Sequence, residues 1–162
     1  MNKKIRDLIE DQINKEFYSA YLYFGIAEYY RAKGLDGFHT WFETQAKEEL
    51  EHGEKFAEYL HDQQEKFELK AINQPNSDFN DFKEPLVLQL AHEKEVTASI
   101  NKIYEEAVKV NDILTQHFLQ WFILEQLEEE KNADDLITRY DLFASDSKVG
   151  LYQMNKDLSM RK

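Results

Sequence analysis

Apolar side chains recur every three or four residues through four long segments of the chain, a spacing that places them along one face of an α-helix. The first segment covers residues 4–33, and the second follows the short link Gly-Leu-Asp-Gly at 34–37. The third begins near Asp81, and the fourth follows Asn111. Only five glycines and two prolines could interrupt this pattern, so it predicts four long helices, each about 40 Å at 1.5 Å per residue.

The links between these segments differ in length, and their lengths predict how the helices are arranged. The links before the second and fourth helices are only a few residues long, which favours antiparallel neighbours. The link at 65–80 is long and polar, and at about 3.3 Å per extended residue it can run the length of a helix. The expected fold is all-α. It is a four-helix bundle over about 4–144, with a long crossover between the second and third helices and a short C-terminal helix at about 147–160.

Composition narrows the class of protein. A length of 162 residues suits one domain, 1–162, because two cores would each be small. The formal net charge of −12 favours cations over phosphate backbones, so no nucleic-acid partner is expected. The chain contains no cysteine, which excludes disulfides and thiolate metal sites. No apolar run approaches the roughly 18 residues of a membrane span, so we expect a soluble, cytoplasmic protein with no membrane partner.

Each of the four apolar faces is interrupted by a carboxylate. Burying even one unpaired carboxylate costs on the order of several kcal/mol. No lysine or arginine occupies these faces at the same levels, so bound metal ions are the simplest neutralising partners. Carboxylate oxygens with one imidazole, here His52 one turn after Glu49, suit Fe, Mn or Zn. These four inward glutamates are Glu16, Glu49, Glu93 and Glu129.

A Glu-x-x-His pair alone is a weak signal, because the chain carries a second one. Glu58 and His61 lie off the apolar face, on either side of Tyr59, and we expect them in solvent. Membership of a four-helix set is what distinguishes Glu49 and His52. A helical bundle without metal chemistry is the alternative, and it predicts apolar residues at the four inward positions.

Two neighbouring positions carry structural expectations. Gly53 lowers helix propensity by about 1 kcal/mol relative to alanine, and the close approach of a neighbouring helix is one possible reason for a glycine there. Trp121 is expected to pack in the core together with Phe118 and Phe122.

Five separated motifs make the chain resemble the bacterial non-haem ferritins. They are E-F-Y-S-A-Y-L-Y from Glu16, E-E-L-E-H ending at His52, H-E at 92–93, W-F-I-L-E-Q-L-E-E-E-K from Trp121 and G-L-Y-Q-M-N-K-D-L from Gly150. The motifs keep the family's order and spacing over nearly the whole chain. The resemblance implies a ferritin-like four-helix bundle with a short fifth helix, and a homo-oligomer in which 24 copies form a hollow shell.

The resemblance also implies a di-iron ferroxidase centre inside the bundle. One iron would bind Glu16, Glu49 and His52. The second would bind Glu49, Glu93 and Glu129, so that Glu49 bridges the two irons.

Other residues match family positions beside this centre. The fourth helix offers Gln126-x-x-Glu129 where many ferritin-like di-iron proteins carry a second Glu-x-x-His, and the resemblance implies that the glutamine hydrogen-bonds an oxygen species near the second iron. Tyr23 matches a tyrosine regarded as an electron donor or redox relay, although core packing explains a tyrosine there equally well. A third, inward iron site of the bacterial members corresponds to Glu48, Glu125, Glu128 and Glu129.

The function that the resemblance implies is iron storage and detoxification. Fe2+ would be oxidised at the paired site with O2 or H2O2 as the acceptor, and ferric oxyhydroxide mineral would be deposited inside the shell. Bacterioferritins place a haem-ligating methionine directly after the bridging glutamate, and this chain has Leu50 there, so no haem is expected. A monomeric or dimeric di-metal enzyme, such as a peroxide-reducing relative, is the alternative that the sequence leaves open.

Overall fold

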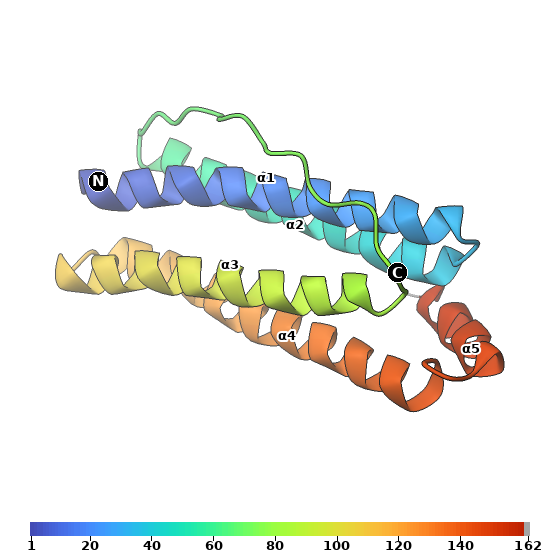
Figure 1. Ribbon diagram of the computed structural model, residues 1–162. Helices are drawn as coiled ribbons and strands as arrows, with labels where there is room; N and C mark the ends of the chain where they lie inside the picture. The colour runs from blue at the N-terminus through green and yellow to red at the C-terminus, as the bar shows by residue number, and fades with distance from the viewer. Residues whose placement is uncertain (161–162) are drawn as a thin grey trace.

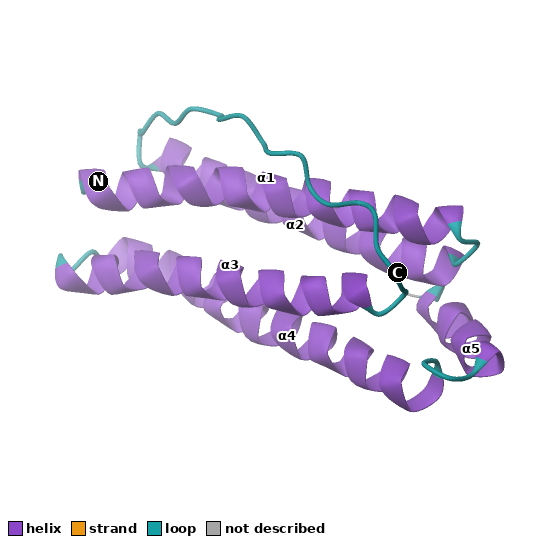
Figure 2. Cartoon of the chain, in the orientation of Figure 1, coloured by secondary structure: helices purple, strands orange, loops and turns teal. Residues whose placement is uncertain are grey.

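The computed structural model describes residues 1–160, and within them it contains five α-helices and no strand (Figures 1 and 2). The prediction of a four-helix bundle with a short C-terminal helix is confirmed, and the helix bounds lie within one or two residues of the predicted 4–144 and 147–160. The single domain predicted over 1–162 stays a prediction, and its last two residues lie outside the described part. The helices are α1 (Lys3–Ala32), α2 (Asp36–Asp62), α3 (Glu84–Lys109), α4 (Ile113–Phe143) and α5 (Lys148–Leu158).

The four long helices form two antiparallel hairpins, α1 with α2 and α3 with α4, and α5 lies across one end of the bundle (Figure 1). The crossover at 63–83 runs along the outside of α1 from the end of α2 to the start of α3 (Figure 2). Among the described residues, no Cα atom of α2 lies within 8 Å of a Cα atom of α4. The seam between these two helices is therefore wide enough to hold side chains from both. No helix in the described range combines the length and apolar character that a membrane crossing would require.

Capping side chains and one glycine set four of the helix ends. The side chains of Asn2, Asp112 and Ser147 each accept a hydrogen bond from a main-chain N–H in the first turn of α1, α4 and α5. Such caps satisfy N–H groups that have no partner within the helix. Gly34 follows α1 with a φ of 76°, the left-handed conformation that favours glycine after a helix.

The third helix begins later than the sequence indicated. Asp81 was expected near its start, but α3 begins at Glu84. The Asp81 carboxylate accepts hydrogen bonds from the N–H groups of Lys83 and Glu84, each at 2.8 Å. In return, Oε2 of Glu84 accepts from the N–H of Asn80 at 2.7 Å. These reciprocal hydrogen bonds lie in a turn that precedes the helix, and the helical hydrogen bonds start after that turn.

Two apolar clusters fill the bundle, and a polar layer separates them on every long helix. Tyr30 and Phe42 belong to the cluster nearer α5, whereas Ile9 and Phe56 belong to the cluster at the other end. Each fully buried side chain of this kind contributes about 2 kcal/mol of hydrophobic stabilisation, so the clusters stabilise the bundle on both sides of the layer. The buried polar layer includes Glu16 on α1, Glu49 and His52 on α2, Glu93 on α3, and Gln126 and Glu129 on α4.

Gly53 lets α1 and α2 approach closely beside the polar layer. A Cβ atom at this position would lie 2.5 Å from the ring of Phe17 on α1. Cβ atoms do not come this close to a neighbour, so any larger residue would push the ring aside. The close helix approach that the glycine suggested is present.

The short helix α5 caps the start of α2. The side-chain oxygen of Asn155 accepts hydrogen bonds from the main-chain N–H groups of Gly37 at 2.8 Å and Phe38 at 3.2 Å. The residue that precedes α2, Leu35, offers no side-chain cap of its own. A Cβ atom on Gly37 would lie 1.6 Å from the main-chain oxygen of Asn155. A glycine at this position is therefore required for α5 to dock.

We predict that Gly37→Ala destabilises the protein by more than Asn155→Ala. Loss of the cap alone should cost about 1 kcal/mol, whereas the added methyl group also displaces α5. Thermal unfolding measures both effects. Gly25→Ala is the matched control, because a Cβ atom there meets only an ordinary contact at 3.4 Å. Equal melting temperatures for Gly37→Ala and Gly25→Ala would contradict the docking described here.

Candidate metal centre

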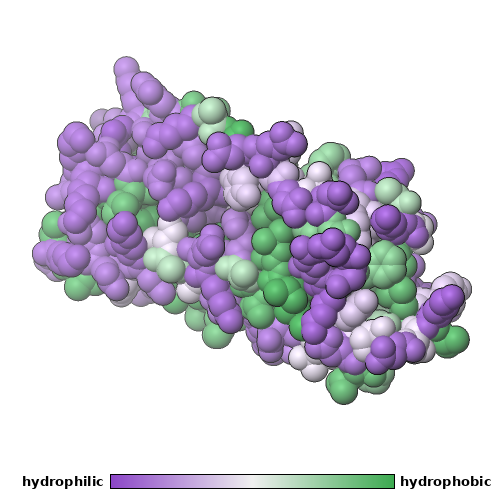
Figure 3. Space-filling model, viewed as in Figure 1, coloured by the Kyte–Doolittle hydropathy of each residue, from purple (hydrophilic) through white to green (hydrophobic). Residues whose placement is uncertain are grey.

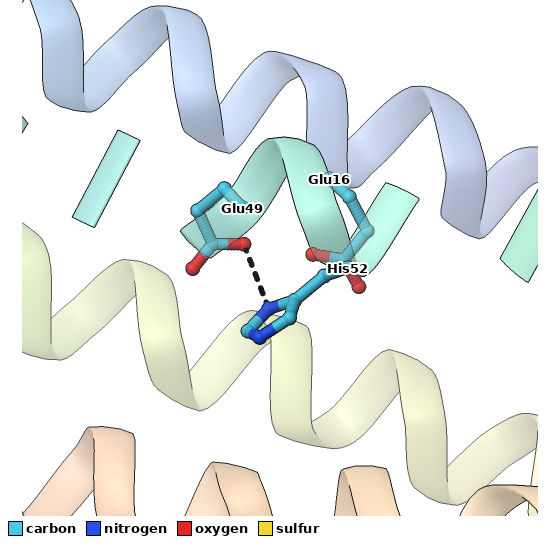
Figure 4. A group of neighbouring side chains, drawn as sticks. All are labelled: Glu16, Glu49 and His52. Atoms are coloured by element: carbon cyan, nitrogen blue, oxygen red, sulfur yellow. Dashed lines mark ion pairs between the residues drawn. The ribbon is translucent and has the colours of Figure 1, made fainter. Parts of the chain in front are cut away.

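Three ligand-type side chains converge in the polar layer. Glu16 comes from α1, and Glu49 and His52 come from consecutive turns of α2 (Figure 4). One potential ligand atom from each lies within 4.8 Å of the others, and all three side chains are buried. Nδ1 of His52 lies 3.5 Å from Oε2 of Glu49. The cluster contains the three residues predicted for the first iron.

Three of the four carboxylate oxygens of this cluster have no hydrogen-bond donor. No N–H or hydroxyl group donates to either oxygen of Glu49 or to Oε2 of Glu16. The remaining oxygen of Glu16 accepts from Nε2 of Gln12 at 2.7 Å. Buried carboxylate oxygens without donors are costly, and within the described residues no lysine or arginine pairs with them. Two carboxylates and an imidazole suit a cation such as Fe2+.

The two remaining inward glutamates accept hydrogen bonds from other buried side chains of the bundle. The Tyr23 hydroxyl donates a short hydrogen bond to Oε1 of Glu93, and Nε2 of Gln126 donates to Oε2 at 3.1 Å. Oε2 of Glu129 accepts from Nε2 of Gln45 at 2.8 Å. Neither of these carboxylates belongs to the cluster of Glu16, Glu49 and His52, in which the ligand atoms lie within 4.8 Å of one another.

The inward glutamates nevertheless act on one another electrostatically. Burial raises the pKa of Glu16 and of Glu49 well above the usual glutamate range, and a neighbouring carboxylate adds to each shift: Glu49 for Glu16, and Glu93 for Glu49. Burial also raises the pKa of Glu93. The pKa of Glu129 rises to about 7, first through burial and then through the charge of Glu93. A cation among these groups would relieve both the desolvation and the repulsion.

The residues predicted for a third iron are more exposed. Glu48 and Glu125 are half-buried, and Glu128 is exposed on α4. Oε1 of Glu125 lies 3.9 Å from Nε2 of His52, and the charge of Glu48 contributes to the raised pKa values of Glu49 and Glu129. Two of these residues thus border the centre, and the third iron site stays a prediction.

Sequence reasoning assigned no role to three buried glutamines. Each stands four residues before an inward glutamate, and therefore on the same helical face. Gln12 donates to Glu16 on its own helix, whereas Gln45 reaches across the seam. Both are fully buried. The repeated spacing was a signal that the sequence contained. The three pairs are Gln12 with Glu16, Gln45 with Glu49, and Gln89 with Glu93.

The expectation for Trp121 was wrong. Its side chain is 41% exposed, whereas Phe122 is buried and stacks on Phe56 with ring centroids 4.0 Å apart. Adjacent residues on a helix point about 100° apart, so only one of the two can face the core. Trp121 instead meets the ring of His52 edge-on at 5.5 Å and lies under the ammonium group of Lys55 at 4.2 Å. It covers the rim of the centre.

Known proteins are similar to this chain in sequence and in fold over nearly its whole length. The family profile of the ferritin-like domain matches residues 6–143. The bacterial non-haem ferritins of Staphylococcus aureus and Staphylococcus haemolyticus are each 34% identical over 161 residues, which is 99% of this chain and 96% of theirs. An open-pore ferritin from the hyperthermophilic archaeon Archaeoglobus fulgidus superposes with a TM-score of 0.97 at 34% identity, covering 100% of this chain and 99% of that one.

An engineered closed form of the Archaeoglobus fulgidus ferritin gives a TM-score of 0.96 at 34% identity and covers 100% of this chain and 98% of that one. The resemblance inferred from the five motifs is therefore confirmed. The family match over most of the chain, the full-length relatives and the shared fold agree, and the chain belongs to the ferritin family.

Proposed function

We propose that this protein oxidises Fe2+ to Fe3+ at a di-iron centre in the polar layer and stores the product as ferric oxyhydroxide mineral inside a shell of 24 copies. Iron is the substrate and the cargo. The single observation that carries the proposal is Glu49, a fully buried carboxylate whose two oxygens receive no N–H or hydroxyl donor. Two open oxygens on one carboxylate are what a bridge between two cations requires.

In this proposal two sets of ligands share Glu49. Glu16 and His52 each bring a ligand atom within 4.8 Å of it. The charges of Glu93 and Glu129 both contribute to its raised pKa. Cations 3.5 to 4 Å apart, as in two-metal sites generally, would each contact Glu49. Two Fe2+ ions could then deliver two electrons to one O2, which with two protons yields H2O2, or to one H2O2, which with two protons yields two molecules of water.

The side chains around the ligands would hold and protect the centre. Gln126 and Tyr23 orient Glu93 by donating to its two oxygens. The hydrogen bond also links Tyr23 directly to a predicted ligand, which supports its proposed role as an electron donor. Ferric product would leave along the less buried Glu48 and Glu125 toward exposed Glu128, which match the third iron site of bacterial ferritins.

An apolar groove supports assembly into a homo-oligomer. It measures about 670 Å³ between α1 and α2, and its lining includes Phe17, Tyr21, Phe24, Leu50 and Ile72. Several of these side chains are half exposed. Separately from this groove, apolar residues also gather near the middle of the face drawn in Figure 3. A second copy of the chain would remove them from water. The lining of the groove offers no thioether or imidazole to ligate haem, which supports the proposal of a shell without haem.

The first test removes the bridging ligand and the imidazole together. Glu49→Ala with His52→Ala should slow Fe2+ oxidation by more than about a hundredfold, because loss of even an outer partner of a metal ligand costs about 10- to 100-fold. Stopped-flow absorbance after anaerobic loading and addition of O2 measures the rate. The exposed pair Glu58→Ala with His61→Ala is the control, since it removes the same residue types. Wild-type rates in the first double variant would refute the assignment.

The assembly is tested by mass in solution. A shell of 24 chains of 19.3 kDa should elute with a mass of about 460 kDa by size exclusion with light scattering. It should retain mineral iron after aerobic loading. A mass of about 20 to 40 kDa would instead support the monomeric or dimeric di-metal enzyme.

The metal-free protein should lose stability as the pH rises. The Glu129 carboxyl has a pKa of about 7 in the folded chain and 4.5 as its ordinary value. Between these values the folded state keeps a proton that the unfolded state has lost. The stabilisation is thus complete below pH 4.5 and is lost as the pH approaches and passes 7. The groups that act on Glu129 are Glu93, Gln45, Glu48 and His52, together with Tyr23, whose own pKa its charge raises.

Glu129→Gln should therefore be more stable than the wild type in metal-free protein at pH 8, by up to about 3 kcal/mol, and close to it at pH 4.5. Thermal unfolding at a series of pH values measures the difference. The exposed neighbour provides the control, since Glu128→Gln makes the same chemical change outside the buried layer. A Glu129→Gln difference that varies with pH no more than the Glu128→Gln difference would show that the Glu129 carboxyl does not carry the effect.

A further inference from the structure

We propose that Thr97 and Glu130 are positioning residues of the iron centre, which act through Gln126 to hold the Glu93 carboxylate in place. This inference rests on the proposed function of the centre. It concerns two residues that lie outside the predicted ligand set, one on α3 and one on α4.

A continuous set of hydrogen bonds leads from Glu130 to Glu93. The Thr97 hydroxyl donates to Oε1 of Glu130 at 2.6 Å. Nε2 of Gln126 lies 3.3 Å from Oγ1 of Thr97, 3.1 Å from Oε2 of Glu93 and 3.3 Å from the main-chain oxygen of Glu93. Thr97 stands one turn after Glu93 on α3, and Glu130 stands one turn after Gln126 on α4. The four residues therefore face one another across the interface of this hairpin.

The network fixes which atom donates at each step. A hydroxyl has one hydrogen, and at Thr97 the short bond to a carboxylate takes it. Toward Gln126, the Thr97 oxygen can then only accept. The amide nitrogen of Gln126 supplies two hydrogens, and the surrounding oxygens of Glu93 and Thr97 accept them. If the Gln126 amide were turned by 180°, its oxygen would face the same three oxygens of Glu93 and Thr97. The orientation with the nitrogen toward them is therefore strongly favoured.

The amide orientation determines how Glu93 is held. Oε2 of Glu93 accepts from Gln126 on α4, and Oε1 accepts from Tyr23 on α1. The carboxylate is completely buried and is thus supported from two sides by two helices. Without the Thr97 hydroxyl, Nε2 of Gln126, itself only 2% exposed, would keep two acceptors, the main-chain oxygen and Oε2 of Glu93. The amide would lose the contact that sets its position relative to these two oxygens, and its hydrogen bond to the Glu93 carboxylate would be less well directed.

Solvent reaches this network from outside the bundle. A groove of about 300 Å³ between α3 and α4 is lined by Thr97, Gln126 and Glu130, together with apolar side chains such as Ile100 and Leu127. Gln126 therefore borders both the groove and Glu93. Water in the groove competes for the same donors and acceptors, and the Thr97 bond to Glu130 keeps the Gln126 amide directed inward against that competition.

The test separates the hydroxyl from the shape of the side chain. Thr97→Val keeps the β-branched shape without the hydroxyl, and Thr97→Ser keeps the hydroxyl. In an anaerobic Co2+ titration followed by visible absorption, the wild type should bind two ions per chain. Thr97→Val should bind the second roughly tenfold more weakly, because only the Glu93 side is disturbed. The initial rate of Fe2+ oxidation should fall by a similar factor, and Thr97→Ser should restore both quantities.

Thr44→Val is the matched control, because the Thr44 hydroxyl donates to the main-chain oxygen of Thr40 on α2, outside the centre. Wild-type affinity in Thr97→Val, or a loss that Thr97→Ser does not restore, would overturn the proposal. If Thr97→Val fails to fold, Glu130→Ala tests the other end of the network, and unchanged second-site affinity there would overturn it equally. A wild-type protein that binds fewer than two Co2+ ions would instead refute the proposed function itself.

Discussion

The bundle depends on the neutralisation of carboxylates that it buries at one level. Desolvation raises the pKa of each of the inward glutamates, and the charges of neighbouring carboxylates add to most of these shifts. Such a layer persists only because apolar clusters on either side supply the stabilisation that the layer itself lacks. Side chains such as Gln45 and Glu129 meet in the seam between α2 and α4, whereas the close contact of Phe17 with Gly53 brings α1 and α2 together at a different interface.

Helical periodicity made the fold and the inward carboxylates predictable from the sequence. A residue's position in a 3.6-residue repeat fixes the face on which it lies, so Glu16, Glu49, Glu93 and Glu129 could be placed inside the bundle, and all four are buried. The lengths of the links then set the order and direction of the helices. Periodicity does not encode which side chains meet between helices. The bond from Gln45 to Glu129 and the support of Glu93 by Tyr23 required coordinates.

Two predictions from the sequence were wrong because neighbouring residues compete for one helix face or for one set of N–H groups. Phe122 occupies the core position that Trp121 could also have taken, and the sequence alone does not determine which of the two rings is buried. Asp81 binds the N–H groups of a turn, so the helix it was expected to begin starts three residues later. The sequence also did not show that the Glu49 oxygens lack hydrogen-bond donors whereas both Glu93 oxygens have one. This difference depends on donors from three different helices.

The crossover shows where sequence is constrained and where it is free. Arg6 Nη1 donates to the main-chain oxygen at position 66 at 2.7 Å, Glu10 Oε2 accepts the N–H of position 68 at 3.1 Å, and Asn14 Oδ1 accepts the N–H of position 70 at 2.7 Å. In each bond the crossover contributes a backbone atom, either a carbonyl oxygen, which every residue provides, or an N–H, which only proline lacks. The side chains of Lys70 and Phe67 add an ion pair with Asp11 at 3.8 Å and packing against an apolar cluster, so side chains of α1 guide part of the path. Exposed side chains of the crossover that lie outside the apolar groove and make no ion pair are less constrained, and they offer attachment points for foreign peptides that leave the path intact.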